Sequence, residues 1–459
     1  MNNISYIAIY VVTAALILVS HSATATQATE SDNVGPFFTD LNLKAEVIVK
    51  GLKSPTSMAF LAPDDILVSE KNGTLQRIVN GVKLPQPLID LNVVSKTDNQ
   101  GFLGIAVLKN TSQASLDEQS KSVYLYYTAD RKQDEGDIKV NNSLHNFLYK
   151  YDYLNNTLLN PKLVLDLPAG TWHNGGKMLI DRNNLIYLIV GEAKAPNLAH
   201  ERNKALNYQG NFSDDPDGRG GVLRIDQNGR EIGSHGILGD KDPLNKYYAY
   251  GIRNSFGMDF DPLTGKLWDT ENGPTFGDEI NLVEPGFNSG WNKVQGLWTV
   301  TGERNNETPG SVSEKPNNLV SFNGKGKYNP PELTWRISAG PTALKFLSTD
   351  KLGKQYENDM LTTDIDTGRI YRFELNHNRT GLLLNGPLSD KVADSHDELD
   401  NVVFAGGFRL ISDLEIGPDG YLYVIVFNEG KIYRVLPKNA DDNILPDLDQ
   451  VSKNSLATN

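Results

Sequence analysis

Apolar and polar positions alternate along short runs of this chain, and each run ends at a turn rich in Asp, Asn, Pro and Gly. Strict alternation is typical of a β-strand with one buried face, and two such runs around a tight turn predict a β-hairpin. The pattern is clearest in residues 62–79, 181–192, 261–273, 358–375 and 417–436.

Few windows keep apolar residues at helical spacing without an intervening Gly or Pro, so the pattern predicts an all-β protein. Hairpins that recur over roughly 400 residues favour a β-propeller over a sandwich or solenoid, because single hairpins cannot bury their faces alone. With roughly 65 to 70 residues per unit we expect six blades of four antiparallel strands. The propeller is predicted to span residues 41–438, with surface loops at 129–141 and 301–327 and a disordered polar tail at 439–459.

The N-terminal segment is apolar from Tyr6 to Ser20 and is followed by small residues at 21–26. Residues 1–25 are therefore interpreted as a signal peptide or an N-terminal anchor. The absence of Lys or Arg before the apolar core leaves the uncleaved anchor open. In both cases we expect the folded part to lie outside the cytoplasm, secreted or held at the membrane by this segment alone.

Composition excludes several classes of chemistry. None of the 459 residues is cysteine, which removes Cys-ligated zinc, iron–sulfur clusters and thiol nucleophiles. A formal net charge of −13 argues against a nucleic-acid partner, because such binding needs a positive surface. A redox function would require an organic cofactor or a metal bound by oxygen and nitrogen.

Residues 248–292 hold the densest group of candidate functional residues. Arg253 and Asn254 offer hydrogen-bond donors to a planar anion, and the main-chain carbonyls of Gly273 and Pro274 are hard oxygen ligands. Asp278 and Glu279 add negative charge nearby, so the segment suggests a corner for a cofactor and calcium. The alternative is ordinary turn and loop hydrogen bonding.

Two further clusters lie earlier in the chain. His173 stands in the Gly-flanked loop TWHNGGKMLI, where an imidazole oriented by a carboxylate is suited to general-base catalysis. Gln100, in DNQGFLGIAV, could both donate to and accept from a carbonyl-rich ring. A histidine satisfied by local backbone and a simple turn glutamine are the alternatives.

The order of these pieces, QGFLG from Gln100, HNGG from His173, YGIRN ending at Asn254 and ENGP followed by GDEIN, resembles the soluble pyrroloquinoline-quinone (PQQ) sugar dehydrogenases. This is the glucose/sorbosone dehydrogenase family, whose fold is a six-bladed propeller. The resemblance covers about residues 41–436. It implies an exported enzyme that oxidises an aldose, or a related hydroxyl or aldehyde compound, by hydride transfer to PQQ with calcium assisting.

The resemblance also assigns roles to single residues. His173 matches the catalytic base, and Glu192 stands where the family usually has an Asp that orients it. Gln100, Arg253 and Asn254 match positions that hold the quinone, and the carbonyls of Gly273 and Pro274 match those that bind calcium. The implied partners are a sugar and an unidentified electron acceptor.

Three positions depart from the family. Asp366 stands near the place of a cofactor-binding Lys, and Leu410 and Ser412 replace the arginines of an Arg-x-Arg-Asp run. Lys345, Arg369 and Arg409 are the cations nearest to these positions in the sequence. Losing charge-assisted partners costs affinity for a tricarboxylate such as PQQ.

Two other functions stay open. A propeller that has lost PQQ could act as a carbohydrate-binding or cell-surface interaction module. A calcium-dependent lactonase would need converging side-chain carboxylates, whereas the clusters above supply amides, an Arg and a His.

Overall fold

The predicted hairpins are present in the computed structural model, which describes residues 35–97, 99–109, 121–131, 144–193, 216–302, 307–312, 316 and 319–440. The predicted signal or anchor, residues 1–25, and the predicted tail beyond Ala440 lie outside the described residues. The chain divides into two units, Met1–Gly35 and Pro36–Asn459, and every described strand belongs to the second.

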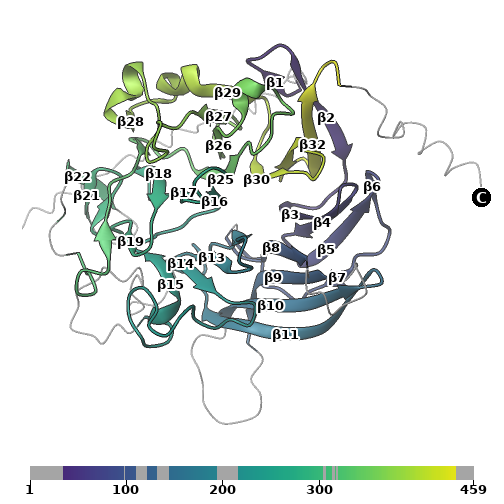
Figure 1. The fold of residues 1–459 in the computed structure, drawn as a ribbon, viewed down its shortest axis with the longest axis horizontal. Coiled ribbons are helices and arrows are strands. Elements are labelled where there is room, and N and C mark those ends of the chain that lie inside the picture. Colours follow the sequence, from purple (N-terminus) through teal and green to yellow (C-terminus); the bar gives the residue numbers. More distant parts are fainter. Residues whose placement is uncertain are drawn as a thin grey trace, which may run out of the picture. The chain divides into compact units, whose positions relative to one another are not determined.

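Six sheets surround a common centre within the second unit (Figure 1). The first two follow the chain directly. They comprise β3 (Pro55–Ala62), β4 (Asp65–Glu70), β5 (Thr74–Val79) and β6 (Val82–Lys83) with β7 (Ile89–Asp90) also on β5, then β8 (Phe102–Lys109), β9 (Lys121–Asp130), β10 (Leu144–Leu154) and β11 (Thr157–Pro168).

The third and fourth sheets carry additional parallel strands at their outer edges. The third comprises β12 (Met178–Ile180), β13 (Ile186–Val190), β14 (Gly221–Ile225) and β15 (Tyr247–Tyr250), then β19 (Phe287–Asn288) and β23 (Lys327–Tyr328). The fourth comprises β16 (Gly257–Phe260), β17 (Leu267–Glu271), β18 (Asp278–Val283) and β24 (Leu333–Trp335), then β28 (Val392–Ala393).

The last two sheets take strands from both ends of the unit. The fifth comprises β25 (Pro341–Phe346), β26 (Met360–Asp364), β27 (Ile370–Phe373), β29 (Val403–Gly406) and β1 (Phe37–Phe38), and the sixth comprises β30 (Ile411–Ile416), β31 (Leu422–Val426), β32 (Lys431–Pro437) and β2 (Leu43–Val49). Because β2 comes from the start of the unit and pairs with β32 from its end, this pairing closes the ring.

The first strand of each sheet lies next to the first strand of the next, in the closed order β3, β8, β12, β16, β25, β30 and back to β3. Each sheet keeps a run of four antiparallel strands. The prediction of an all-β, six-bladed propeller with four-stranded antiparallel blades is confirmed.

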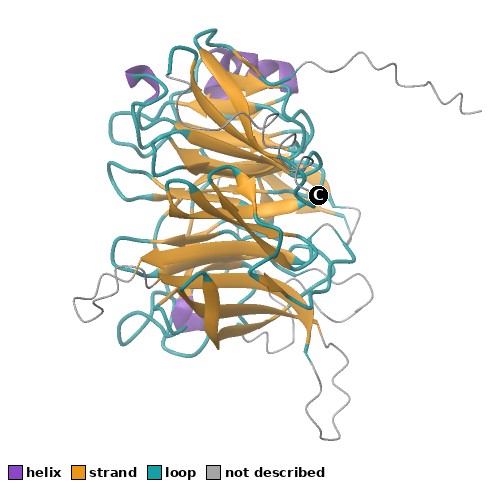
Figure 2. Ribbon diagram, turned by 90° about the vertical axis from the view of Figure 1, so that its right-hand side faces the viewer, coloured by secondary structure: helices purple, strands orange, loops and turns teal. Residues whose placement is uncertain are grey.

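Side chains from adjacent blades form the core. Tyr124 and Tyr126 of β9 pack with Leu188 and Leu223 of the third sheet, and Trp268 packs with residues of the fourth and fifth sheets. Because both faces of each blade are covered, strands in the middle of a blade are buried throughout, as in β13 and β31. The loops lie mostly at the two ends of the strands (Figure 2).

The described helices are four short 3₁₀ turns: η1 (Leu244–Lys246), η2 (Lys354–Tyr356), η3 (Gly386–Asp390) and η4 (His396–Val402). Among the described residues, no helix has the length and apolar character needed to cross a membrane. The prediction of a plain loop at 301–327 is wrong in part, because β22 (Thr308–Val312) pairs with β21 (Trp298–Thr301), which also pairs with β20 (Val294–Gln295). This strand is almost wholly exposed and lacks the apolar alternation that marks the blades.

Candidate active site

His173 lies in the loop between β11 and β12, and its backbone is held in a conformation that side chains rarely adopt. Its φ angle is 61°, in the left-handed region. Asn99 Oδ1 accepts its N–H at 3.0 Å, and its carbonyl accepts the N–H of Ala193 at 2.9 Å. A Cβ at Gly191 would lie 2.2 Å from the same carbonyl, so only glycine permits this approach. The surroundings therefore fix the position of the imidazole.

Glu192 orients that imidazole. His173 Nδ1 and Glu192 Oε1 are 2.8 Å apart, and the indole Nε1 of Trp291 donates to Glu192 Oε2 at 2.5 Å. Burial opposes ionisation of Glu192, which is 1% exposed. His173, Arg253 and Trp291 together nevertheless hold the pKa of Glu192 below its ordinary value. A buried, ionised carboxylate therefore faces the imidazole.

Arg253 lies beside this pair, in the loop between β15 and β16. Its guanidinium lies over the ring of Trp291, with its central carbon 5.3 Å from the ring centroid. Its Nη1 donates to the carbonyls of Asn272 and Gly273 at 2.8 and 2.9 Å, and its backbone N–H donates to Glu271 Oε1 at 2.7 Å. Burial lowers the pKa of Arg253, with Glu192 as the leading opposing influence, but a guanidinium stays charged at neutral pH.

Asp278 fixes the turn at Gly273 and Pro274. Gly273 N–H donates to Asp278 Oδ1 at 2.7 Å, and the N–H groups of Ala339 and Gly340 donate to Oδ2 at 2.7 and 2.8 Å. Burial raises the pKa of Asp278, although these hydrogen bonds oppose the rise. The turn predicted to hold calcium is therefore anchored to the loop before β25.

Four buried polar atoms in this corner lack a hydrogen-bond partner. They are Gln100 Oε1, Arg253 Nε, Asn254 Oδ1 and Asn272 Oδ1. Gln100 itself is held by donation from its Nε2 to the carbonyl of Gly170 at 3.1 Å. Because unpaired buried polar groups are costly, these atoms are available to pair with a bound ligand or with water.

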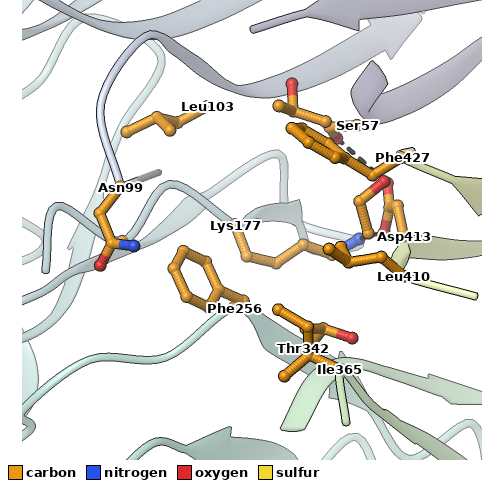
Figure 3. Close-up of a pocket in the computed structure, with 13 residues that line it drawn as sticks. Ser57, Asn99, Leu103, Lys177, Phe256, Thr342, Ile365, Leu410, Asp413 and Phe427 are labelled. Atoms are coloured by element: carbon orange, nitrogen blue, oxygen red, sulfur yellow. Dashed lines mark hydrogen bonds and ion pairs between the residues drawn. The ribbon is translucent and has the colours of Figure 1, made fainter. Parts of the chain in front are cut away.

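A pocket of about 270 Å³ adjoins these groups (Figure 3). Three of its lining residues stand one or two positions from predicted site residues: Asn99 precedes Gln100, Gly175 follows His173, and Phe256 follows Asn254. Thr342 also lines it and follows Pro341, whose carbonyl accepts from Asn272 Nδ2 at 2.8 Å. Segments far apart in the sequence thus meet at one pocket.

The predicted site residues lie close together beside this pocket. His173, Glu192, Arg253 and Gly273 are linked through the contacts above, and Asn254 joins them because its carbonyl accepts the N–H of Asn272 at 2.8 Å. Gln100 neighbours Asn99 in the chain. Pro274 enters the corner only as the neighbour of Gly273.

The departures from the family are also placed. Leu410 and Ser412 line the pocket, whereas Asp366 does not and is exposed; Ile365 lines the pocket instead. Asp366, predicted to stand near the place of the family's Lys, thus does not line this pocket, because the hairpin presents the preceding side chain.

The three cations that are nearest in the sequence lie close to carboxylates that do not line the pocket. Lys345 Nζ lies 2.8 Å from Glu415 Oε2, Arg369 Nη1 lies 2.9 Å from Asp400 Oδ1, and Arg409 Nε lies 3.9 Å from Glu429 Oε1. None of the three lines the pocket.

Trp291 is the functional residue that sequence reasoning missed. It contacts both Glu192 and Arg253, yet it stands 99 positions from its hydrogen-bond partner. The sequence gives one indication of its importance: it follows a glycine near the end of the candidate segment 248–292. The sequence suggests no role for Asn174 of the HNGG motif. Its side chain donates to the carbonyls of Asn99 and Gly170 at 2.7 and 2.9 Å and so connects the two loops.

Known proteins share both the sequence pattern and the fold. The chain is 24% identical over 402 residues to aldose sugar dehydrogenase YliI of Escherichia coli, covering 86% of this chain and 94% of that protein. The fold matches the apo-form of the soluble aldose sugar dehydrogenase of Escherichia coli with a TM-score of 0.62, at 21% identity, over 86% of this chain and 100% of the other.

The PQQ-bound form of an aldose sugar dehydrogenase from Streptomyces coelicolor matches with a TM-score of 0.57 at 20% identity, over 86% of this chain and 98% of the other. The sequence model of the family described as Glucose / Sorbosone dehydrogenase matches residues 52–434. That match spans most of the chain, so the protein belongs to the glucose/sorbosone dehydrogenase family.

Proposed function

We propose that the protein is an oxidoreductase that takes a hydride from an aldose, or from a related hydroxyl or aldehyde compound, and passes it to a bound quinone with calcium assisting. The observation that carries this proposal is the buried His173–Glu192 pair beside a pocket and a charged guanidinium. The names of the relatives, which are sugar dehydrogenases, support the same class of reaction.

The chain's own residues account for the proton. With Nδ1 engaged by Glu192, Nε2 of His173 is the nitrogen that accepts the proton of the substrate hydroxyl. Glu192 stabilises the imidazolium that results. As the O–H and C–H bonds break, the oxygen forms a C=O bond and the hydride leaves carbon. A bound quinone supplies the two-electron acceptor, and Arg253 stabilises negative charge that develops beside it.

The donor set fits a quinone ring and a calcium ion. Arg253 Nε is an unpartnered donor for a ring oxygen, and Asn254 Oδ1 and Asn272 Oδ1 are unpartnered neutral oxygens of the kind calcium takes. Within the described ranges, no three His, Asp or Glu side chains gather as a metal site. Calcium would therefore be held by amide oxygens, including the carbonyls of Gly273 and Pro274.

The three carboxylates of PQQ fit less well than its ring. The pocket lining shows no cation available to pair with them among the described residues, since its one cation, Lys177, already bonds Asp413. PQQ itself therefore stays a prediction, and no step above depends on it.

Turnover is the direct test of the proposal. The purified chain, with calcium and either PQQ or the neutral quinone 9,10-phenanthrenequinone, should reduce a redox dye when given some member of a panel of aldoses and alcohols. The His173→Ala variant should lose about 100-fold or more of this activity, since general-base catalysis contributes that much. His235, which is exposed and remote from the pocket, provides a matched control, and His235→Ala should keep full activity. Equal activity of the two variants, or no turnover of any compound with either quinone, would refute the proposal.

A second candidate is a carbohydrate-binding or interaction module that no longer turns over. The observation that favours it is the pocket's lack of an available cation. Calorimetry that finds sugar binding, unchanged by His173→Ala and without dye reduction, would support this candidate instead. The lactonase alternative has no support in the described residues, because no carboxylate metal cluster is found there.

We further propose an extracytoplasmic location, which rests on the apolar character of residues 6–20. Detection of the native protein outside the cytoplasmic fraction of its source cells is the corresponding test.

A further inference from the structure

The pocket beside the candidate active site presents mainly apolar surface, although five apolar side chains share its lining with seven polar ones. Phe256 lies on one side of the hollow in Figure 3 and Phe427 lies across it. The other apolar lining residues are Leu103, Ile365 and Leu410. The polar lining consists of hydroxyls such as those of Thr342 and Ser412, one amide, and the charged pair of Lys177 and Asp413. Two aromatic rings among aliphatic groups suit a flat, apolar molecule.

Charged groups at one side of the pocket neutralise one another. Lys177 Nζ lies 2.7 Å from Asp413 Oδ1 and 2.9 Å from Glu415 Oε1. Asp413 also accepts from Ser57 Oγ and the N–H of Met58, both at 3.1 Å. These pairings leave no surplus positive charge on Lys177.

The next layer of this network is not positive either. Lys345 Nζ lies 2.8 Å from Glu415 Oε2 and 3.5 Å from Asp259 Oδ2. Two ammonium groups thus face the three carboxylates of Asp259, Asp413 and Glu415. Burial raises the pKa of Asp413, whereas Lys177 and Lys345 overcome burial and lower the pKa of Glu415 to about 2. With all three carboxylates ionised the network carries one net negative charge, and it does not attract an incoming anion.

Arg253 could pair with one anionic group of a ligand, but the described lining of the pocket offers no further unpaired cation, so the other charges of a tricarboxylate would be buried without partners. Burying an unpaired carboxylate costs several kcal/mol or shifts its pKa, so such groups would remove most of the affinity. A neutral ring pays no such cost and gains contact with the two aromatic side chains.

Resting on the proposed function, we propose that the quinone held by this pocket carries fewer carboxylates than PQQ: a neutral, planar ortho-quinone is the ligand class that the lining selects. Arg253 Nε would donate to such a ring, and Phe256 and Phe427 would contact its apolar body.

A titration of the full chain with two quinones tests the selectivity. Tryptophan fluorescence is followed while PQQ or 9,10-phenanthrenequinone is added, with calcium present. The neutral quinone should bind about tenfold more tightly or better, a difference of about 1.4 kcal/mol or more. Equal or tighter binding of PQQ overturns the inference, and so does the absence of binding by both quinones.

Charge restoration tests the cause. In the variant Leu410→Arg with Ser412→Arg, PQQ should bind about tenfold more tightly than in the uncharged control Leu410→Gln with Ser412→Gln. Circular dichroism verifies that both proteins are folded, and the single variant Ser412→Lys replaces the pair if the pair does not fold. Identical PQQ affinities in folded Arg and Gln variants contradict the inference.

These binding results are separable from turnover. If the neutral quinone binds but no sugar reduces it, the proposed function fails and the pocket assignment stands. If PQQ binds more tightly and supports turnover, the assignment fails and the proposed function stands.

Discussion

At the scale of single residues, the strongest feature is the use of both oxygens of Glu192. One faces His173 Nδ1 and the other accepts from Trp291, so the carboxylate fixes the ring and its tautomer together. The lowered pKa of Glu192 means that this acceptor is ionised at neutral pH. In the proposed reaction Glu192 acts on the substrate through His173 and is a positioning residue.

The variant Glu192→Gln should lower kcat about 100-fold or more while changing KM little. The amide of Gln would donate to Nδ1, which leaves the proton of neutral imidazole on Nε2 and removes the base. Steady-state kinetics of the quinone-loaded protein measure this split.

The chain offers a matched control. His145 Nδ1 lies 2.5 Å from Asp166 Oδ1 between β10 and β11, in a second His–carboxylate pair that does not line the pocket. Asp166→Asn should leave kcat unchanged. Similar losses in both variants would mean that Glu192 matters only for stability.

The candidate base and its carboxylate could be predicted from the sequence, because the loop around His173 and the Gly191-Glu192 pair that follows β13 match a recognisable family pattern. Trp291 could not be predicted, because its hydrogen bond to Glu192 depends on how two blades pack together. Nor could the pocket-facing residue of the β26–β27 turn be chosen, because Ile365 and Asp366 are adjacent and the turn alone decides which one faces inward.

At the scale of elements, the strands β17 and β18 carry an unusual buried polar face. Asp269 pairs with Asn281 and Glu271 pairs with Glu279, so these four side chains share one side of the sheet. All are buried, and Ser289 donates to Glu271 Oε2 at 2.5 Å. Alternation in the sequence assigns them to one face, but it predicts a solvent face, because it does not reveal that the adjoining segment from β19 to β20 covers them.

This face predicts a pH dependence of stability. Burial raises the pKa of Glu279 to about 8, and raises those of Asp269 and Glu271 well above their ordinary values. The folded state then keeps protons that the unfolded chain releases near its ordinary carboxyl pKa. The free energy of unfolding should therefore fall as pH rises from about 5 to 8, by about 1.4 kcal/mol per pH unit from Glu279, with Asp269 and Glu271 acting in the same direction.

Urea unfolding at several pH values measures this slope. Glu279→Gln should make the slope shallower, whereas Glu284→Gln, at an exposed position shortly after β18, should not change it. Stability that rises over this range, or an identical slope in both variants, would contradict the assignment of protonated buried carboxyls.

At the scale of the whole propeller, the pairing of β2 with β32 closes the ring and holds six inner strands in a circle. The repeated hairpins made the all-β class and the blade count predictable, since each hairpin needs neighbours on both faces. The closure and the meeting of residues from Thr56 to Phe427 at one pocket are long-range properties that local periodicity does not encode. We propose that, at this pocket, hydride is removed from a substrate carbon.

Single-turnover reduction of the bound quinone by an aldose, compared with the same aldose deuterated at the reacting carbon, tests that claim most directly. The protein is loaded with calcium and with whichever of 9,10-phenanthrenequinone and PQQ it binds more tightly. We predict that the deuterated sugar reduces the quinone several-fold more slowly, and that His173→Ala abolishes reduction by both. Equal rates for the two sugars in the unaltered protein, or no reduction of the bound quinone by any sugar, would contradict the account.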